Sequence, residues 1–163
     1  MRKALKYITL LIFIFVIGCK TEEKTENTDK NLNAVLLDKE GNPIPLDENK
    51  IIVVNFLSYS CVSCMKELPV FKQVLSEEKY KDKFQFVGIV LDSSEGDFSD
   101  KNFPIYPNNN RNFVRFKVNG TPTTYIILPN GRKLIVIYGA ITPKSLRKFL
   151  DEALKKAEKY REY

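Results

Sequence analysis

Apolar residues along the chain group into short runs that alternate between strand-like and helix-like spacing. Residues 51–57 and 84–91 are nearly continuous apolar runs, a pattern typical of parallel strands buried on both faces. Residues 65–78 lie between these runs and carry apolar side chains at helical spacing, namely Leu68, Phe71, Val74 and Leu75. This part of the chain therefore predicts a strand, a helix and a second strand.

The second half of the chain changes from this alternation to a hairpin pattern. Residues 110–118 favour a short helix. Residues 123–128 and 133–138 are β-rich runs joined through Asn130 and Gly131, a dipeptide that favours a hairpin turn. We expect these two strands to pair antiparallel.

The ends of the predicted domain carry a hairpin and a helix. Residues 34–37 and 44–46 flank a turn-rich segment and favour a short edge hairpin. Thr142 and Pro143 suit the N-cap and first position of a closing helix, whose apolar stripe consists of Leu146, Phe149, Leu150, Ala153, Leu154 and Ala157. We interpret that stripe as core.

Together these elements predict one α/β domain over residues 33–163. Parallel strands need crossover helices, whereas strands that share a tight turn pair antiparallel, so the central sheet should be mixed and flanked by helices. This arrangement is thioredoxin-like, with the N-terminal β-hairpin as an extension.

The amino terminus has the pattern of a secretory signal peptide, which we assign to residues 1–18. Arg2, Lys3 and Lys6 precede an apolar run at residues 7–17. That run is about 11 residues long, well short of the ~20 that a membrane-spanning helix needs. Export is therefore favoured over a permanent membrane span.

The signal segment ends at Gly18 and Cys19, which resemble the junction at which a bacterial lipoprotein is cleaved and lipidated on its cysteine. Lipidated Cys19 would begin a flexible tether over residues 19–32, because this segment is polar and lacks apolar periodicity. Ordinary cleavage, or an uncleaved anchor with Cys19 incidental, is the alternative. The resulting expectation is a lipid-anchored, extracytoplasmic protein of the bacterial cell envelope.

The charge of the chain gives little support to nucleic-acid binding. The 163 residues include 26 Lys and Arg, 20 Asp and Glu and no His, for a formal net charge of +6. Removing the three cations of residues 1–18 leaves +3, which we interpret as a solvated surface.

Two of the three cysteines, Cys61 and Cys64, stand where the strand of residues 51–57 leads into a helix. A helix start stabilises a thiolate, which is the form that attacks disulfides. Two thiols without histidine are too few ligands for a zinc site, and Met65 excludes the C-x-x-C-H haem motif. We therefore expect a redox pair with no metal and no other cofactor; the alternative is a structural disulfide, which a four-residue loop would make worth only ~2 kcal/mol.

Three separated motifs resemble the TlpA/ResA branch of the thioredoxin superfamily. Residues 55–69 are similar to the family's strand, W-C-x-x-C motif and E-x-P helix start; residues 120–125 are similar to its G-x-P-x-x-F/Y segment; and Asn130-Gly131 matches its hairpin turn. The resemblance implies a thioredoxin fold and an extracytoplasmic thiol-disulfide oxidoreductase of the protein-disulfide reductase type.

The resemblance also implies roles for the site residues. Cys61 would attack a substrate disulfide, and Cys64 would resolve the mixed disulfide. Glu67, three residues further on, would accept the proton of Cys64. Thioredoxin itself uses an aspartate at the position of Asn55, which cannot titrate.

The family's segment at residues 120–125 implies a cis-proline at Pro122 beside the cysteines. In this arrangement the backbone of Thr121 would pair with an extended substrate peptide. The alternative is an ordinary trans proline in a turn. Thr121 and Pro122 are thus the predicted substrate-binding residues.

The chain departs from the family pattern at Ser60, where a tryptophan is usual, and at Val62-Ser63, where a proline-containing pair is usual. A histidine between the cysteines makes such domains oxidising, and this chain has none, so we expect a reductant. The resemblance implies a membrane thiol relay as electron donor. The substrates would be exported proteins with disulfides, and three roles stay open: reduction of apocytochrome c, recycling of another thiol protein, and repair of oxidised envelope proteins. We expect a monomer.

Other functions on the same scaffold stay open to different degrees. A non-catalytic module could keep the fold and bind exported proteins near Pro122. A peroxiredoxin-type peroxidase would share the S-x-x-C spacing from Ser58, but its loop proline is Val54 here. A copper-delivering domain of the Sco type needs a histidine that the chain does not have.

Overall fold

A mixed sheet lies at the centre of the computed structural model, which describes residues 33–93 and 100–161. Within those ranges the sheet has five strands in the order β3-β2-β1-β4-β5: β1 (Ile51–Leu57), β2 (Phe84–Val90), β3 (Ile105–Pro107), β4 (Thr123–Ile127) and β5 (Lys133–Tyr138). The predicted signal peptide, lipidated Cys19 and tether lie outside the described residues. In the part that is described, no helix combines the length and apolarity needed to cross a bilayer.

The pairing of the strands confirms the predicted mixed topology. β1 pairs parallel with β2, and β2 pairs parallel with β3. β4 lies antiparallel to both β1 and β5. The β4–β5 turn needs a glycine because Gly131 has a φ of +85°, in the left-handed region that other residues rarely adopt.

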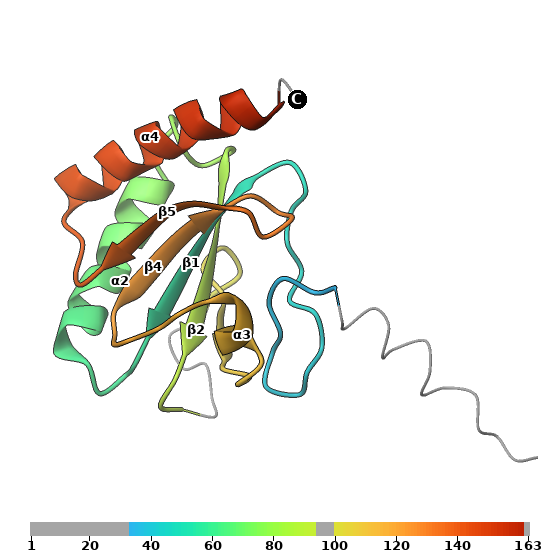
Figure 1. The fold of residues 1–163 in the computed structure, drawn as a ribbon. Helices are drawn as coiled ribbons and strands as arrows, with labels where there is room; N and C mark the ends of the chain where they lie inside the picture. The colour runs from blue at the N-terminus through green and yellow to red at the C-terminus, as the bar shows by residue number, and fades with distance from the viewer. Residues whose placement is uncertain (1–32, 94–99, 162–163) are drawn as a thin grey trace, which may run out of the picture.

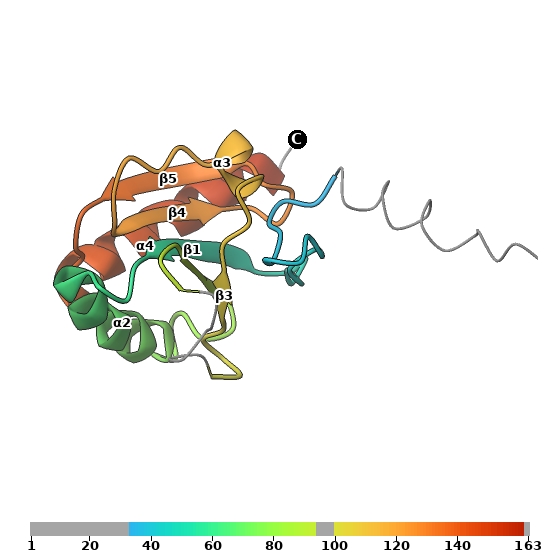
Figure 2. The ribbon, with the colours of Figure 1, turned by 90° about the horizontal axis from the view of Figure 1, so that it is seen from below.

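The two faces of the sheet pack against different layers (Figures 1 and 2). Alternate residues of β1, beginning with Ile51 and Val53, pack with the helices α2 (Val62–Leu75) and α4 (Pro143–Arg161). Their neighbours, among them Val54 and Phe56, pack on the other face with Phe116, which directly follows α3 (Asn112–Arg115), and with residues of the N-terminal segment 33–46. Both clusters consist of residues from 35 onward, so the described part of the chain has its own core.

The closing helix α4 forms as the sequence predicts. It begins at Pro143, and the hydroxyl of Thr142 accepts a hydrogen bond from the Ser145 amide at 3.2 Å, which is an N-cap interaction. The predicted apolar stripe is buried or half-buried against the sheet.

The remaining elements differ in extent from the prediction. α2 begins at Val62 rather than at residue 65, because Cys61 caps it, and α3 covers only four of the expected nine positions. β3 was not expected. The N-terminal hairpin consists of one bridge between Leu37 and Pro43, since prolines have no N–H with which to extend a ladder.

Candidate active site

The sheet topology brings Cys61 and Pro122 to the same edge. Cys61 follows the carboxyl end of β1, and Pro122 precedes the first residue of β4. Because β4 is antiparallel to β1, its start lies beside the end of β1, with Phe56 opposite Thr123. Two segments 60 residues apart in the sequence therefore meet at one point.

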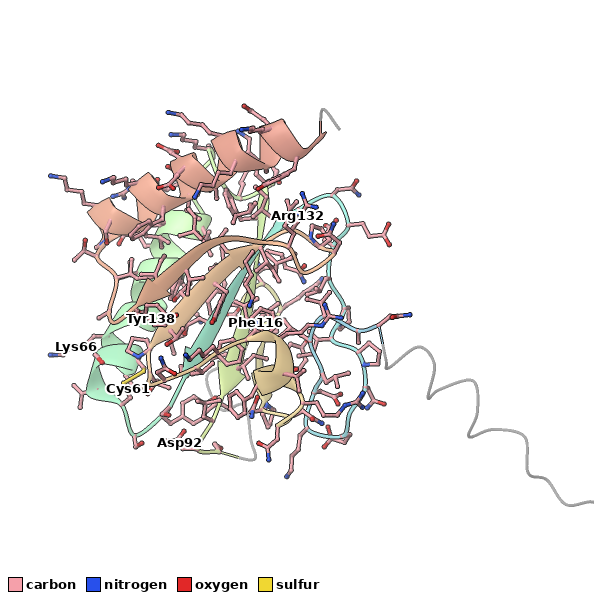
Figure 3. All side chains as sticks on the ribbon, viewed as in Figure 1. Cys61, Lys66, Asp92, Phe116, Arg132 and Tyr138 are labelled. Atoms are coloured by element: carbon pink, nitrogen blue, oxygen red, sulfur yellow. A yellow bond between two sulfur atoms is a disulfide. The ribbon has the colours of Figure 1, made fainter. Side chains whose placement is uncertain are left out.

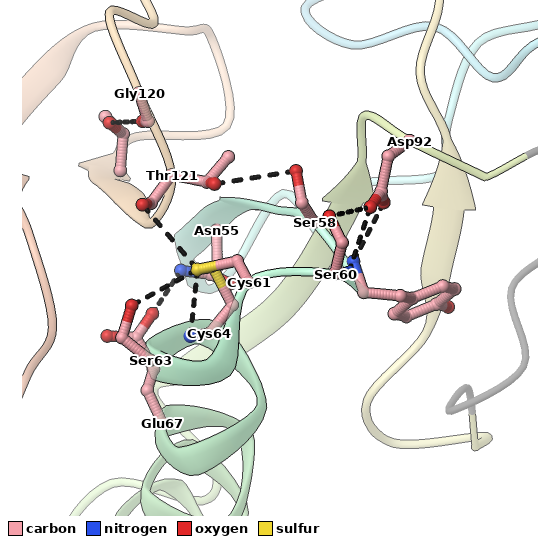
Figure 4. Close-up of a disulfide and its surroundings, with 12 residues drawn as sticks. Asn55, Ser58, Ser60, Cys61, Ser63, Cys64, Glu67, Asp92, Gly120 and Thr121 are labelled. Atoms are coloured by element: carbon pink, nitrogen blue, oxygen red, sulfur yellow. Dashed lines mark hydrogen bonds between the residues drawn. A yellow bond between two sulfur atoms is a disulfide. The ribbon is translucent and has the colours of Figure 1, made fainter.

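Cys61 is the N-cap of α2 and forms a disulfide with Cys64, their Cα atoms lying 5.3 Å apart (Figure 4). Its sulfur accepts a hydrogen bond from the Cys64 amide at 3.2 Å. Ser63 Oγ lies 3.2 Å from the same sulfur and must be the donor in the oxidised state, because a disulfide sulfur has no hydrogen. Cys61 is partly exposed and Cys64 is fully buried, as an attacking and a resolving thiol should be.

The Thr121–Pro122 peptide bond is cis, as predicted. The Thr121 carbonyl oxygen lies 3.7 Å from Cys61 Sγ, and the Thr121 hydroxyl donates to Ser58 Oγ at 3.5 Å. Thr121 and Cys61, which are both partly exposed, thus lie side by side, and the predicted substrate-binding residue Pro122 is buried next to Thr121.

Glu67 is buried on α2, with only 1% of its surface exposed. Its two carboxyl oxygens accept hydrogen bonds from Asn55 Nδ2 at 2.8 Å and from the Ile141 amide at 2.9 Å. Burial raises the pKa of Glu67 to about 7, and these two donors oppose the rise. A carboxyl group with this pKa can accept a proton near neutral pH.

Asn55 connects Glu67 to the sheet. Its Nδ2 also donates to Thr124 Oγ1 at 3.0 Å, so strands β1 and β4 both hold the amide. The Asn55 Oδ1 atom is buried and has no hydrogen-bond partner within residues 33–93 and 100–161. The amide therefore has one unused acceptor in the middle of the site.

Asp92 holds the segment that leads into Cys61, a contact that sequence reasoning missed. Its carboxylate accepts hydrogen bonds from the Tyr59 amide at 2.8 Å and from the amide and hydroxyl of Ser60 at 3.0 and 2.6 Å. These bonds, that of the Ser60 hydroxyl above all, lower the pKa of Asp92. Asp92 follows β2, whose end lies beside the end of β1, and this parallel neighbourhood is the signal that could have revealed it.

Groups of three or more His, Cys, Asp or Glu side chains that could hold a metal ion do not occur among the described residues. The polar groups gathered at the edge of the sheet instead suit thiol-disulfide exchange. They comprise an exposed sulfur at a helix start, a buried second sulfur and a buried carboxyl group on the same helix.

Comparison with known proteins agrees with this geometry. The model of the thioredoxin-like domain family matches residues 34–154. The thiol-disulfide oxidoreductase ResA of Oceanobacillus iheyensis is 32% identical over 114 residues, which cover 64% of this chain and 58% of that protein. ResA of Bacillus thuringiensis is 29% identical over 167 residues, covering 91% of this chain and 95% of that protein.

Solved structures show the same fold. The exposed lipoprotein thioredoxin Etrx1 of Streptococcus pneumoniae has a TM-score of 0.58 at 21% identity, covering 72% of this chain and 96% of that one. StoA of Bacillus subtilis has a TM-score of 0.53 at 20% identity, covering 71% and 93%. The chain therefore belongs to the thioredoxin-like domain family, as a thiol-disulfide oxidoreductase similar to ResA.

Proposed function

We propose that this protein is tethered in the bacterial cell envelope and reduces disulfides of exported proteins. The observation that carries the proposal is the placement of Cys61 at the exposed start of α2, with Cys64 and Glu67 buried behind it. The redox-active disulfide would be the only redox group that the reaction needs.

In the first step, the Cys61 thiolate attacks one sulfur of a substrate disulfide. A bond forms between Cys61 and that sulfur, and the other substrate sulfur leaves as a thiolate and takes up a proton. The N-terminus of α2 and the Cys64 amide, which lies 3.2 Å from Cys61 Sγ, stabilise the attacking thiolate.

In the second step, Cys64 transfers its proton to the Glu67 carboxylate and attacks Cys61 Sγ. The Cys61–Cys64 disulfide forms, the bond between Cys61 and the attacked substrate sulfur breaks, and that sulfur leaves as a thiolate and takes up a proton. Two electrons have then moved from the cysteine pair to the substrate. An external dithiol, which we propose is a membrane thiol relay, returns two electrons and restores the reduced pair.

The substrate would bind as an extended peptide along Thr121. The backbone N–H of this residue has no hydrogen-bond partner in the described part of the chain, and its carbonyl faces Cys61. Backbone pairing at this point would place a substrate disulfide against the exposed sulfur, with little dependence on the substrate sequence.

Insulin reduction with single cysteine variants tests the mechanism. Cys61→Ala should abolish reduction and form no mixed disulfide, whereas Cys64→Ala should abolish turnover but trap a mixed disulfide through Cys61. Absence of reduction by the intact pair would favour a non-catalytic binding module. Rapid oxidation of Cys61 by peroxide in stopped flow would favour a peroxidase.

The residues between the cysteines support the proposed direction of electron flow. Val62 and Ser63 include no histidine that would make the pair oxidising. We expect a reduction potential nearer to the about −270 mV of thioredoxin than to the about −120 mV of DsbA. Equilibration with glutathione at fixed ratios measures it, and a value near that of DsbA would reverse the proposed direction.

The membrane placement depends on residues 1–32. The junction at Cys19 supports lipidation, and the similar pneumococcal protein is an exposed lipoprotein. Metabolic labelling with a radioactive fatty acid should mark the wild-type chain but not Cys19→Ala. Equal labelling of both would exclude Cys19 as the lipidated residue.

A further inference from the structure

Residues 101–150 carry nine basic residues and no acidic one. Residues 33–100, in contrast, carry twelve acidic and seven basic residues. From the whole chain we expected charges spread over a solvated surface. The counts of the two stretches show instead that the charge is unevenly distributed along the chain. It is segregated: the cations of residues 101–150 lie at or beside α3, at the β4–β5 turn and at the start of α4, apart from Lys101, which precedes β3.

Five of the nine cations lie together around α3 and the β4–β5 turn, and all five are exposed. We call this area, with the two apolar residues at its centre, the α3 surface: Arg111, Phe113, Val114, Arg115, Lys117, Arg132 and Lys133. A Cβ atom on Gly131 would lie 3.3 Å from the Arg115 guanidinium, and Lys133 Nζ lies 5.7 Å from the centre of the Phe116 ring. These contacts join the turn to α3.

The cations of the α3 surface make no ion pairs within residues 33–93 and 100–161; instead, two of them lie over aromatic rings. Asp38 and Glu40 reach the border of the surface, because the turn that carries them contacts Asn109 through the Lys39 carbonyl. Lys39 offsets one of these charges, so the surface stays strongly positive.

Two apolar side chains project between the cations. Val114 is 89% exposed and Phe113 is 41% exposed, and both lie between Arg111 and Arg115 on α3. An apolar tip ringed by cations fits the interface of an anionic bilayer, where cations meet head groups and apolar side chains enter below them. A purely acidic protein partner would leave this tip without a role.

The chain enters the domain at the same surface. Ala34 and Val35 line a cavity of about 230 Å³ with Arg111, Val114 and Arg115, and Asn112 exchanges two hydrogen bonds of 2.9 Å with the Leu37 backbone. A tether that joins the domain at residue 33 therefore starts beside the α3 surface.

The disulfide lies away from this area. β4 ends opposite the beginning of β1, so the turn that carries Arg132 is at the far end of the sheet from Cys61 (Figure 3). α3 itself lies over the face of the sheet opposite to α2 (Figure 2), so a bilayer on the α3 surface would leave Cys61, which caps α2, on the side away from the lipid.

We propose that the α3 surface docks onto an anionic lipid bilayer and so orients the tethered enzyme with Cys61 away from the membrane. The inference builds on the proposed membrane placement and adds a second binding element to the lipid on Cys19. Two weak elements together hold a protein on a membrane where one alone binds only marginally.

The test uses a fragment of residues 33–163, which contains both core clusters and lacks Cys19, so that failure of lipidation cannot affect the result. Sedimentation with vesicles of equal phosphatidylglycerol and phosphatidylcholine should show binding that falls with added salt, and phosphatidylcholine alone should show none. Insulin reduction by the same fragment reports separately on the proposed function.

Variants localise the effect. Each cation near an anionic surface contributes about fivefold in affinity, so Arg111→Gln, Arg115→Gln and Lys117→Gln together should weaken vesicle binding on the order of 100-fold. The matched control removes the same charge elsewhere, with Lys101→Gln, Lys144→Gln and Lys148→Gln, and should bind far better than that variant. Both should reduce insulin normally.

Three results would overturn the proposal. The first is no binding to anionic vesicles at low salt, and the second is an equal loss in both triple variants, which would indicate net charge alone. The third is binding to polyglutamate without binding to vesicles, which would indicate an acidic protein as the partner of this surface.

Discussion

Glu67 links the chemistry of the site to the stability of the domain. Its carboxyl group is buried where it can take the proton of a resolving thiol, and burial raises its pKa to about 7. The donors Asn55 and Ile141 keep the ionised form accessible. The fold is therefore more stable when Glu67 is protonated, whereas the proposed mechanism needs Glu67 ionised.

The raised pKa predicts that the domain loses stability as the pH rises from about 4.5 to about 7. The unfolded chain releases the Glu67 proton near 4.5 and the folded chain near 7, so between these values the folded state binds more protons. The free energy of unfolding should fall by roughly 3 kcal/mol across this window because of Glu67 alone.

Urea unfolding at several pH values measures this effect. The contribution is fully present below about 4.5 and absent above about 7, and Glu67→Gln should lack it. The difference between the two proteins isolates Glu67 from the other carboxyl groups. Parallel pH profiles of the wild type and Glu67→Gln would contradict the assignment.

Glu67→Gln should also slow resolution of the mixed disulfide by about 100-fold, because Cys64 then loses its proton acceptor. Attack by Cys61 should keep its rate. Rapid-quench trapping of the mixed disulfide separates the two steps. Glu78→Gln, which changes a glutamate with an 88% exposed side chain, is the control and should leave both rates unchanged.

At the scale of elements, long apolar runs were predictable and short ones were not. β1, β2 and α4 are long enough for their spacing to identify them, and the Asn130-Gly131 turn identifies β4 and β5. β3 has three residues and ends at Pro107, so it is held by its neighbour β2 rather than by a pattern of its own. The first residue of α2 was also not predictable from apolar spacing, because it is set by the N-cap interaction of Cys61.

The site shows a similar division. Short sequence motifs predict four of the site residues, because the residues of each motif are close together in the sequence: Cys61, Cys64, Glu67 and Pro122. Asp92 and the amide of Ile141 come from other parts of the fold and contact Ser60 and Glu67, respectively. These contacts form only because the folded chain brings the end of β2 and the loop before α4 next to the site. Sequence patterns indicate periodicity but do not give these long-range contacts.

The close packing between β2 and β3 at Gly88 predicts that a larger residue at this position would destabilise the domain. A Cβ atom on Gly88 would lie 2.8 Å from Ile105 Cγ1 and 3.3 Å from Leu57 Cδ2. Gly88→Ala should therefore push β3 away from β2 and destabilise the domain by about 1–3 kcal/mol.

Chemical denaturation of the two glycine variants tests this. Gly120→Ala is the matched control, because a Cβ atom there meets no atom within 4 Å, and it should leave stability unchanged or raise it by up to ~1 kcal/mol. Equal midpoints for Gly88→Ala and the wild type would mean that β3 moves freely against β2.

At the scale of the whole molecule, the two faces of the sheet are covered by different kinds of structure. The face under α2 and α4 holds Cys64 and Glu67 in a closed layer. Among the described residues, the other face packs with Phe116 and Val118, which follow α3, and with the N-terminal segment 33–46, which has no regular strand or helix. The core on this face is therefore completed by the N-terminal segment 33–46.

Removal of that segment should unfold the covered face. Leu36 and Ile44, which are 1% and 5% exposed, pack with Val54 and Phe56, and the Leu37 backbone satisfies buried Asn112. Losing two buried aliphatic side chains costs at least ~4 kcal/mol by comparison with core truncations, a large part of the 5–15 kcal/mol that holds an ordinary domain together.

A fragment of residues 47–163 should thus melt at least ~10 °C below the fragment of residues 33–163. Leu36→Ala in the longer fragment should give an intermediate loss, which separates the buried contact from chain length. An equal melting temperature for the two fragments would show that the segment is part of the tether. If the shorter fragment melts early, residues 33–46 belong to the folded domain, because the contacts that Leu36, Leu37 and Ile44 make with the sheet and with Asn112 are then part of what stabilises it.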